Sequence, residues 1–228
     1  MLLASAICSC SEKQPETTEP MITKTEIQVE NGLLTPEIMH RLGKVGDVQV
    51  SPNHAKILYG VSYTSIEQNK GNRELYLMNV DGSENVKITN TPKSESNARW
   101  INDSQIIYMR GGKLYTAKVE GNALKNEKEI TGAEGMESFE LSPAGDKIMF
   151  IKPIKAAQKP TDAYPDLDKS SGRTYTDMMY RHWDHFVEEV PHTYVASFDG
   201  TKVDGIIDIL AGDKANPETE DKKFELPT

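Results

Sequence analysis

The chain has 228 residues and carries 35 acidic against 26 basic side chains, which gives a formal net charge of -9 at neutral pH. An acidic chain is repelled by polyanions, so we expect neither a nucleic-acid partner nor direct binding to an anionic membrane surface. Both of its cysteines lie near the N-terminus, at Cys8 and Cys10. The rest of the chain therefore cannot hold a disulfide framework or a cysteine-based zinc site.

The N-terminus predicts an export signal, because a short apolar run is followed by a polar stretch without structural periodicity. An aliphatic residue, Ile7, stands three positions before Cys10, and the small Ser9 stands directly before it. This arrangement resembles the lipobox of bacterial lipoproteins, which implies that Cys10 is lipidated after cleavage. Cys8 fits the pattern less well, because the bulky Ile7 occupies its small-residue position.

We therefore expect a lipoprotein-type signal over residues 1–10 and a flexible tether over residues 11–32. The resemblance implies a periplasmic or outer-membrane-associated lipoprotein of a Gram-negative bacterium, which touches the membrane only through its lipid anchor. An ordinary secretory signal or a disordered tail is the alternative.

The middle of the chain repeats about every forty residues, and such a period indicates a repeat architecture. Each copy starts with an alternating apolar strand, a tight turn and a second strand that ends in an aromatic residue. The three copies are Val48–Tyr59, Ala98–Tyr108 and Phe139–Phe150.

A third and a fourth strand follow in the same order. Glu74–Gly82 matches Lys113–Gly121, and Lys87–Asn90 matches Glu129–Gly132. Four antiparallel strands per repeat are typical of a β-propeller blade. Because whole four-strand units match, we favour a propeller over a β-sandwich, whose strands also alternate. The predicted fold is an all-β, partial propeller of about three blades, over residues 44–90, 95–132 and 136–211.

The third repeat is interrupted by an insertion of about forty residues, roughly 155–191. Its third strand resumes only at Thr193–Gly200, and Asp208–Leu210 is expected to be the fourth strand. Within the insertion, apolar residues recur at helical spacing from Thr176 to Val190, which predicts a helix that Pro191 ends.

About three blades are too few to close a propeller, which needs four to eight. The segment 213–228 is polar and is expected to lead into another blade. We therefore interpret residues 33–212 as an incomplete propeller and the chain as a fragment.

The repeat Leu141–Phe150 resembles the blades of the translocation protein TolB and of the prolyl oligopeptidase family. The insertion separates the two, because Tyr164–Lys169 and Asp177–Asp184 look like the third-blade insertion of bacterial dipeptidyl peptidase 5 enzymes. Leu34–Met39 and Arg41–Val45 are also similar to the segment that leads into the first blade of that group.

The resemblance implies an exported serine peptidase that removes dipeptides from peptide N-termini. Its catalytic serine, aspartate and histidine would lie in a C-terminal α/β-hydrolase domain, which this chain does not contain. The sequence has no Gly-x-Ser-x-Gly motif, so we assign no catalytic residue to it. The expected role is a propeller that gates access of peptide substrates and needs no cofactor. The alternative is a stand-alone TolB-like propeller that acts as a protein-interaction module at the cell envelope.

One candidate binding site comes from the insertion. Dipeptidyl peptidases hold the free amine of the substrate with propeller carboxylates, because a buried ammonium group needs a charge partner. Glu188 and Glu189 resemble such an acidic pair, and Asp184 is a further candidate. Adjacent residues on a helix point about 100° apart, so we expect only one of the two glutamates to face a pocket. A solvated helix end is the alternative interpretation.

The insertion also contains His182 and His185, three positions apart and next to Asp184. Two histidines at this spacing can share a helix face, but the sequence offers no convincing third ligand. We therefore predict ordinary surface or packing histidines and no metal site.

Overall fold

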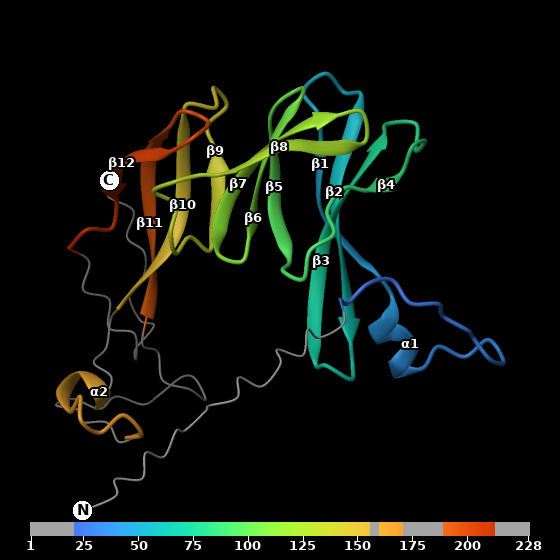
Figure 1. The fold of residues 1–228 in the computed structure, drawn as a ribbon, viewed down its shortest axis with the longest axis horizontal. Coiled ribbons are helices and arrows are strands. Elements are labelled where there is room, and N and C mark those ends of the chain that lie inside the picture. Colours follow the sequence, from blue (N-terminus) through green and yellow to red (C-terminus); the bar gives the residue numbers. More distant parts are fainter. Residues whose placement is uncertain (1–20, 156–159, 171–188, 213–228) are drawn as a thin grey trace, which may run out of the picture.

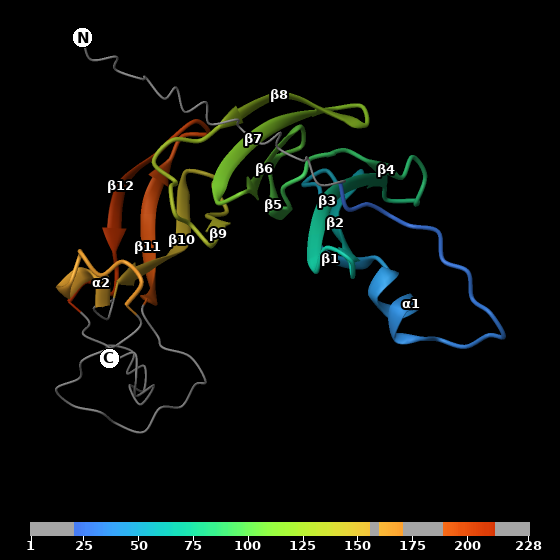
Figure 2. The ribbon, with the colours of Figure 1, turned by 60° about the horizontal axis from the view of Figure 1, so that its bottom comes forward.

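The computed structural model describes residues 21–155, 160–170 and 189–212, and within them the regular secondary structure is almost entirely β (Figure 1). Three four-stranded antiparallel sheets follow one another along an arc (Figure 2). In each sheet the strands are neighbours in sequence order, which is the arrangement of a propeller blade. The predicted fold class, a partial propeller of about three blades, is confirmed.

The first sheet is preceded by helix α1 (Pro36–Arg41). Thr35 caps this helix, because its hydroxyl accepts a hydrogen bond from the backbone N–H of Ile38 at 3.3 Å. Pro36 stands at the first helical position, where a missing N–H costs nothing. The strands of the sheet are β1 (Lys44–Val50), β2 (Lys56–Ser65), β3 (Lys70–Asn79) and β4 (Val86–Lys87).

The second sheet lies between the other two and contributes to both apolar cores. Its third and fourth strands form a hairpin around Gly121, which has a φ of 61° and so occupies the left-handed region that glycine adopts without steric cost. The strands are β5 (Glu95–Asn102), β6 (Gln105–Arg110), β7 (Lys113–Glu120) and β8 (Ala123–Glu129).

The third sheet carries the insertion between its second and third strands. The only helix in the described part of this insertion is α2 (Pro160–Ala163). The strands are β9 (Ser138–Leu141), β10 (Lys147–Lys155), β11 (Glu189–Phe198) and β12 (Val203–Asp208).

Two expected elements of the third sheet are wrong in position. The fourth strand is not Asp208–Leu210, because β12 already begins at Val203 and pairs with Phe198. The reason is a tight turn in which the carboxylate of Asp199 accepts the backbone N–H groups of Thr201 and Lys202, at 2.8 and 2.9 Å.

The predicted helix of the insertion also does not reach Val190. Val190 and Pro191 belong to β11, where they pair with Ile154 and Pro153. Cross-strand pairing of apolar side chains outweighs the helical spacing at this end of the segment. Residues 171–188, which contain the rest of the predicted helix, lie outside the described residues.

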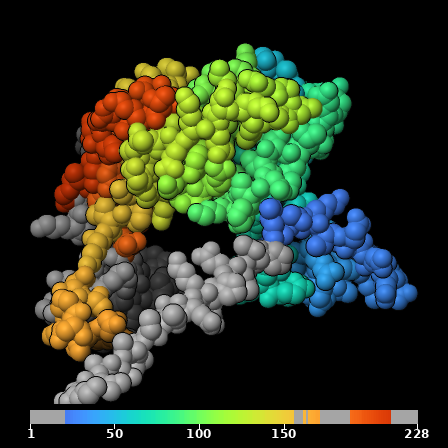
Figure 3. All heavy atoms as spheres, in the orientation of Figure 1, coloured from blue at the N-terminus to red at the C-terminus, as the bar shows by residue number. Residues whose placement is uncertain are grey.

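Equivalent positions in the three repeats show how the sheets pack on one another. Val48, Ala98 and Phe139 occupy the same place in their repeats. Ala98 is buried against the first sheet, and Phe139 is buried against the second. The three sheets form one continuous packed body in the space-filling view (Figure 3). Each sheet thus becomes a stable layer only when its neighbour covers its apolar face.

Among the described residues, no further sheet covers the two end faces of the array. Val48, the equivalent of the buried Ala98, is 56% exposed in the first sheet. Leu58 and Ile107 are fully buried, whereas Met149 at the same place in the third sheet is 47% exposed. Met149 lines a surface hollow of about 300 Å³ together with Leu141 and Val195. Apolar residues at these positions mark faces on which a further layer can pack.

The inner strands β1, β5 and β9 are joined by polar contacts that cross from sheet to sheet. Asn97 links all three: its N–H donates to a carboxylate oxygen of Asp47 at 3.3 Å, and its side-chain amide donates to the carbonyl oxygen of Phe139 at 2.7 Å. Arg99 pairs with Glu140 through two hydrogen bonds, at 2.6 and 3.1 Å. These contacts fix the position of each sheet relative to the next.

Candidate functional site

Two β-ribbons project beyond their sheets toward the same side of the array (Figure 1). In the first sheet, β2 and β3 pair as far as Ser65 and Lys70, whereas β1 begins only at Lys44, opposite Ser62. In the third sheet, β10 and β11 pair as far as Lys155 and Glu189. We call this side of the array, with its two projecting ribbons, the ribbon rim.

The ribbon at the third sheet has a proline on each strand, and the two prolines face each other. Pro153 pairs with Pro191, beyond the last pairs that β10 makes with β9 and β11 makes with β12. Neither proline can donate a hydrogen bond to an added strand. The pair therefore keeps the ribbon two-stranded and directs the chain into the insertion without inviting strand addition at its edges.

Only one residue of the predicted amine-binding set lies within the described residues. Glu189 is the first residue of β11, exposed, and it pairs in register with Lys155 at the root of the insertion. Lys155 forms an ion pair with Asp162 of α2. Glu188 and Asp184 lie outside the described residues, as do His182, His185 and Cys10. The acidic anchor thus stays a prediction, located next to the ribbon rim by Glu189 alone.

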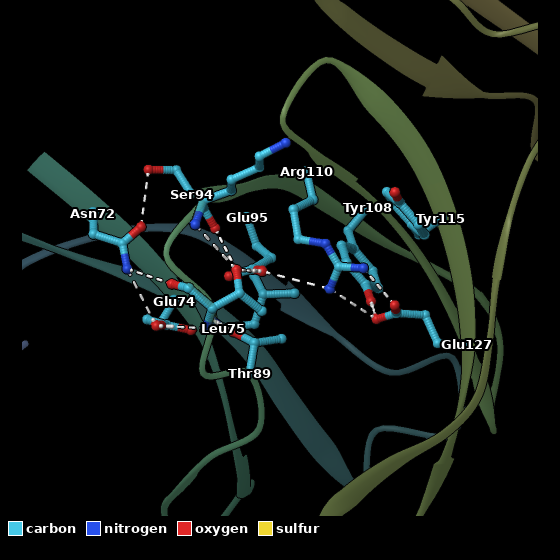
Figure 4. Close-up of polar contacts among 12 residues, drawn as sticks. Asn72, Glu74, Leu75, Thr89, Ser94, Glu95, Tyr108, Arg110, Tyr115 and Glu127 are labelled. Atoms are coloured by element: carbon cyan, nitrogen blue, oxygen red, sulfur yellow. Dashed lines mark hydrogen bonds and ion pairs between the residues drawn. The ribbon is translucent and has the colours of Figure 1, made fainter. Parts of the chain in front are cut away.

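A buried polar cluster that the sequence did not predict lies between the first two sheets (Figure 4). At its centre are two glutamates, Glu74 on β3 and Glu95 at the start of β5, whose side chains are almost completely buried. We call this cluster, which also contains Thr89, Thr91 and Arg110, the carboxylate junction. It lies where the chain crosses from the outer strand β4 to the inner strand β5.

Glu74 has the donors that an ionised carboxylate requires. Its Oε1 accepts hydrogen bonds from the side-chain amide of Asn72 and the backbone N–H of Thr91, both at 3.2 Å. Its Oε2 accepts from the hydroxyl of Thr89 at 2.8 Å. The same hydroxyl accepts a hydrogen bond from the backbone N–H of Leu75 at 2.8 Å. Thr89 thus links the chain that follows β4 to two neighbouring residues of β3.

Glu95 has fewer hydrogen-bond partners than Glu74. Its Oε1 lies 2.7 Å from the hydroxyl of Thr91, and its Oε2 is buried without a hydrogen-bond partner. The nearest cation is Arg110, whose Nη1 is 3.8 Å from Oε1 and thus beyond good hydrogen-bond distance. Burial, and next to it the negative charge of Glu74, raise the pKa of Glu95 to about 7, although Thr91, Thr89 and Arg110 act in the opposite direction.

Arg110 does not neutralise Glu95 because another carboxylate engages it. Its guanidinium forms a two-pronged ion pair with Glu127 of β8, in which Nη1 lies 3.0 Å from Oε2. The guanidinium also stacks over the ring of Tyr115, at 4.3 Å from the ring centre. The hydrogen bonds from Arg110 and Tyr108 lower the pKa of Glu127 in spite of its partial burial.

A second titratable pair occurs in the third sheet. The Nδ1 of the buried His192 lies 2.8 Å from a carboxylate oxygen of Asp208, which also accepts the backbone N–H of Leu210. Although burial opposes the shift, these partners lower the pKa of Asp208. The pair joins β11 to β12 at the root of the ribbon, so it holds the ribbon to its sheet.

The described residues contain no group of three or more histidine, cysteine, aspartate or glutamate side chains that could hold a metal ion. Within the same ranges, no helix has the length and apolar character that a membrane span requires. This part of the chain offers an array of stacked sheets, an insertion at one rim of the third sheet, and a carboxylate junction between the first two sheets.

Comparison with curated proteins identifies relatives with one common name. The chain is 36% identical to dipeptidyl-peptidase 5 of Porphyromonas gingivalis over 187 residues, which is 79% of this chain and 27% of the relative. It is 32% identical to dipeptidyl-peptidase 5 of Porphyromonas endodontalis over 194 residues, or 83% of this chain and 28% of the relative. The chain therefore spans little more than a quarter of the length of these relatives. No model of a known protein family matches it.

Solved structures show the same fold. An acylaminoacyl peptidase of Pyrococcus horikoshii in its orthorhombic crystal form superimposes with a TM-score of 0.52 and 14% identity, covering 75% of this chain and 25% of that one. The uncomplexed form gives a TM-score of 0.53 and 15% identity, with 74% and 25% covered. At such identities the likeness bears on the fold alone.

The carboxylate junction yields a test of its contribution to stability. Thr89→Val removes the hydroxyl that both donates to Glu74 and accepts from Leu75, and it leaves the buried Oε2 of Glu74 and the buried backbone N–H of Leu75 without that hydrogen bond. We expect the free energy of unfolding, measured by urea denaturation, to fall by about 2–3 kcal/mol. Thr116→Val is the control, since Thr116 is also a buried strand threonine but lies outside the junction. A loss no larger than that of the control would show that the junction does not stabilise the fold.

Proposed function

We propose that this chain, which corresponds to the N-terminal propeller part of a prolyl oligopeptidase-family peptidase related to dipeptidyl-peptidase 5, gates access of peptides to a serine peptidase active site. The parent enzyme would release dipeptides from peptide N-termini. The observation that carries this proposal is the 36% identity to dipeptidyl-peptidase 5, which extends over 79% of the chain.

The open end faces support a larger propeller. Val48 and Met149 are exposed at positions where their equivalents in other repeats are buried by a neighbouring sheet. Further blades of the parent protein would cover both faces and complete the ring. The catalytic residues would lie in the part of the relatives that this chain does not span, since its sequence contains no Gly-x-Ser-x-Gly motif.

The ribbon rim is the side of the array from which we propose that substrate is recognised. The insertion leaves the third sheet there, and Glu189 stands at its root. A carboxylate of Glu189, Glu188 or Asp184 would pair with the free α-amine of a peptide, because an ammonium group removed from water requires an opposite charge. Such an anchor would restrict the enzyme to peptides with a free N-terminus.

A stand-alone TolB-like interaction module is the weaker candidate. It accounts for the repeated sheets, which many unrelated propellers share, but it gives no reason for the identity to peptidases over most of the chain. The sequence motifs of the insertion also resemble those of bacterial dipeptidyl peptidase 5 enzymes, and a simple interaction propeller does not need such an insertion. We therefore favour the peptidase.

A direct assay tests the proposed activity. The 228-residue chain alone should release no dipeptide from a chromogenic dipeptidyl substrate, whereas the product of the coding sequence extended by the DNA that follows it should do so. The longer product should also react with a fluorophosphonate probe for active serines. Serine-inhibitor-sensitive activity of the short chain, or following DNA that encodes no hydrolase, would contradict the proposal.

The substrate anchor can be tested in the same active product. Glu189→Gln would be compared with Glu137→Gln, since Glu137 is an exposed glutamate directly before β9. If Glu189 binds the substrate amine, its replacement raises KM by about tenfold or more and leaves kcat largely unchanged. An unchanged KM would remove Glu189 from the anchor and leave Glu188 and Asp184 as candidates.

We also propose that the protein is exported and held at the membrane by a lipid on Cys10. When the gene is expressed in a Gram-negative host with a radiolabelled fatty acid, label should enter the wild type and the Cys8→Ser variant. It should be absent from the Cys10→Ser variant, because the lipid bonds to that thiol. Equal labelling of both variants, or no labelling of the wild type, would refute lipidation at Cys10.

A further inference from the structure

The hydroxyl of Thr91 lies at hydrogen-bond distance from two oxygen atoms, but its single proton can be donated to only one of them. Its oxygen lies 2.7 Å from the carbonyl oxygen of Lys93 and 2.7 Å from Oε1 of Glu95. A carbonyl oxygen can only accept a hydrogen bond, and an ionised carboxylate can also only accept. With Glu95 ionised, one of these two short contacts would bring two acceptors together without a proton between them.

A proton on Glu95 resolves both contacts. The Thr91 hydroxyl then donates to the carbonyl oxygen of Lys93, and the carboxyl group of Glu95 donates to Thr91. The hydroxyl keeps room for a further acceptor role, which the backbone N–H of Lys93 fills at 3.3 Å. Every donor and acceptor around the Thr91 oxygen is satisfied in this arrangement.

The charges around Glu95 agree with a neutral group. From β3, the carboxylate of Glu74 disfavours a negative charge on Glu95, to which it is joined through the backbone N–H and the hydroxyl of Thr91. The nearest cation is Arg110 of β6, but its guanidinium is already ion-paired with Glu127 of β8. Within residues 88–94, the segment that crosses from β4 to β5, the side chain of Lys93 lies against Gly111, on the turn between β6 and β7.

We propose that Glu95 holds a proton in the folded protein near neutral pH. Through the hydrogen bond that it makes to Thr91, this proton fixes the crossing segment between the first two sheets, and we call this arrangement the latch. The segment 88–94 runs from β4 to β5 and is the covalent link between these sheets. The Glu95–Thr91–Lys93 chain of hydrogen bonds fixes it to the start of β5. When the proton leaves to solvent, a buried negative charge without an adequate partner remains beside Glu74, and the latch loses one of its hydrogen bonds.

The protonated state of Glu95 determines how the stability of the folded protein depends on pH. A carboxyl group whose pKa is higher in the folded than in the unfolded protein favours folding at low pH, and this contribution is lost as pH rises through the folded value. With a folded pKa of about 7 against an ordinary 4.5, the folding equilibrium constant falls between about pH 5 and pH 8 by up to roughly 70-fold because of Glu95. The effect opposes the usual loss of stability in acid.

Two measurements on the whole 228-residue chain test the proposal. Carbon-13 NMR of side-chain carboxyl groups should show one glutamate that titrates near neutral pH, and this signal should be absent from Glu95→Gln. Urea denaturation across the same pH range should show the folding equilibrium constant of Glu95→Gln rising relative to wild type by tens of fold between pH 5 and pH 8. Glu120→Gln, an exposed glutamate at the end of β7, should follow the wild type.

A Glu95 signal that titrates in the ordinary range of glutamate would overturn the proposal. So would a Glu95→Gln variant whose pH dependence matches those of the wild type and of Glu120→Gln. If Glu95→Gln does not fold, the NMR titration of the wild type decides, with assignment through the neighbouring resonances of Thr91. Because neither measurement uses enzymatic activity, the outcome is independent of the peptidase proposal.

Discussion

The structure depends on the burial of each sheet face by the sheet next to it. A single four-stranded sheet with apolar residues on both sides cannot be stable in water, and only stacking removes those residues from solvent. Ala98 and Phe139 show the effect of stacking, since each is buried between its own sheet and the preceding one. Val48 stands at the position of Ala98 and Phe139, and Met149 stands at that of Leu58 and Ile107, but both are exposed because no described sheet covers them. The array is therefore a section of a larger ring.

Stacking also creates the conditions for the carboxylate junction. To start the next sheet, the chain must pass from an outer strand to an inner one, and its backbone groups then enter the seam between two sheets. Thr89, Thr91 and Asn72 supply the hydrogen bonds that the buried backbone and Glu74 need there. Glu95 is left with too few partners, and a proton makes up the difference. The unusual protonation thus follows from the way in which the sheets are joined.

The sequence predicted the three sheets because aromatic and apolar residues recur in whole four-strand units, and burial acts on that pattern. It did not predict the junction, since a glutamate such as Glu74 within a strand looks like a solvent-facing residue until the crossing segment is seen to cover it. The end of the insertion was misjudged because Val190 suits a helix face and a strand equally well. For the amine anchor, Glu189 alone is described, and local pattern cannot say where a side chain at the root of an insertion points.

Hydrogen exchange of the backbone amides, measured on the 228-residue chain, tests the stacked arrangement most directly. Of the three described sheets, the second alone has a neighbouring sheet on both faces, so its amides on β6 should exchange more slowly than those on β2 and β10, whose sheets have a neighbour on one face only. Exchange on β6 that is as fast as on β2 and β10 would contradict the stacking of the three sheets, and with it the account of the junction between them.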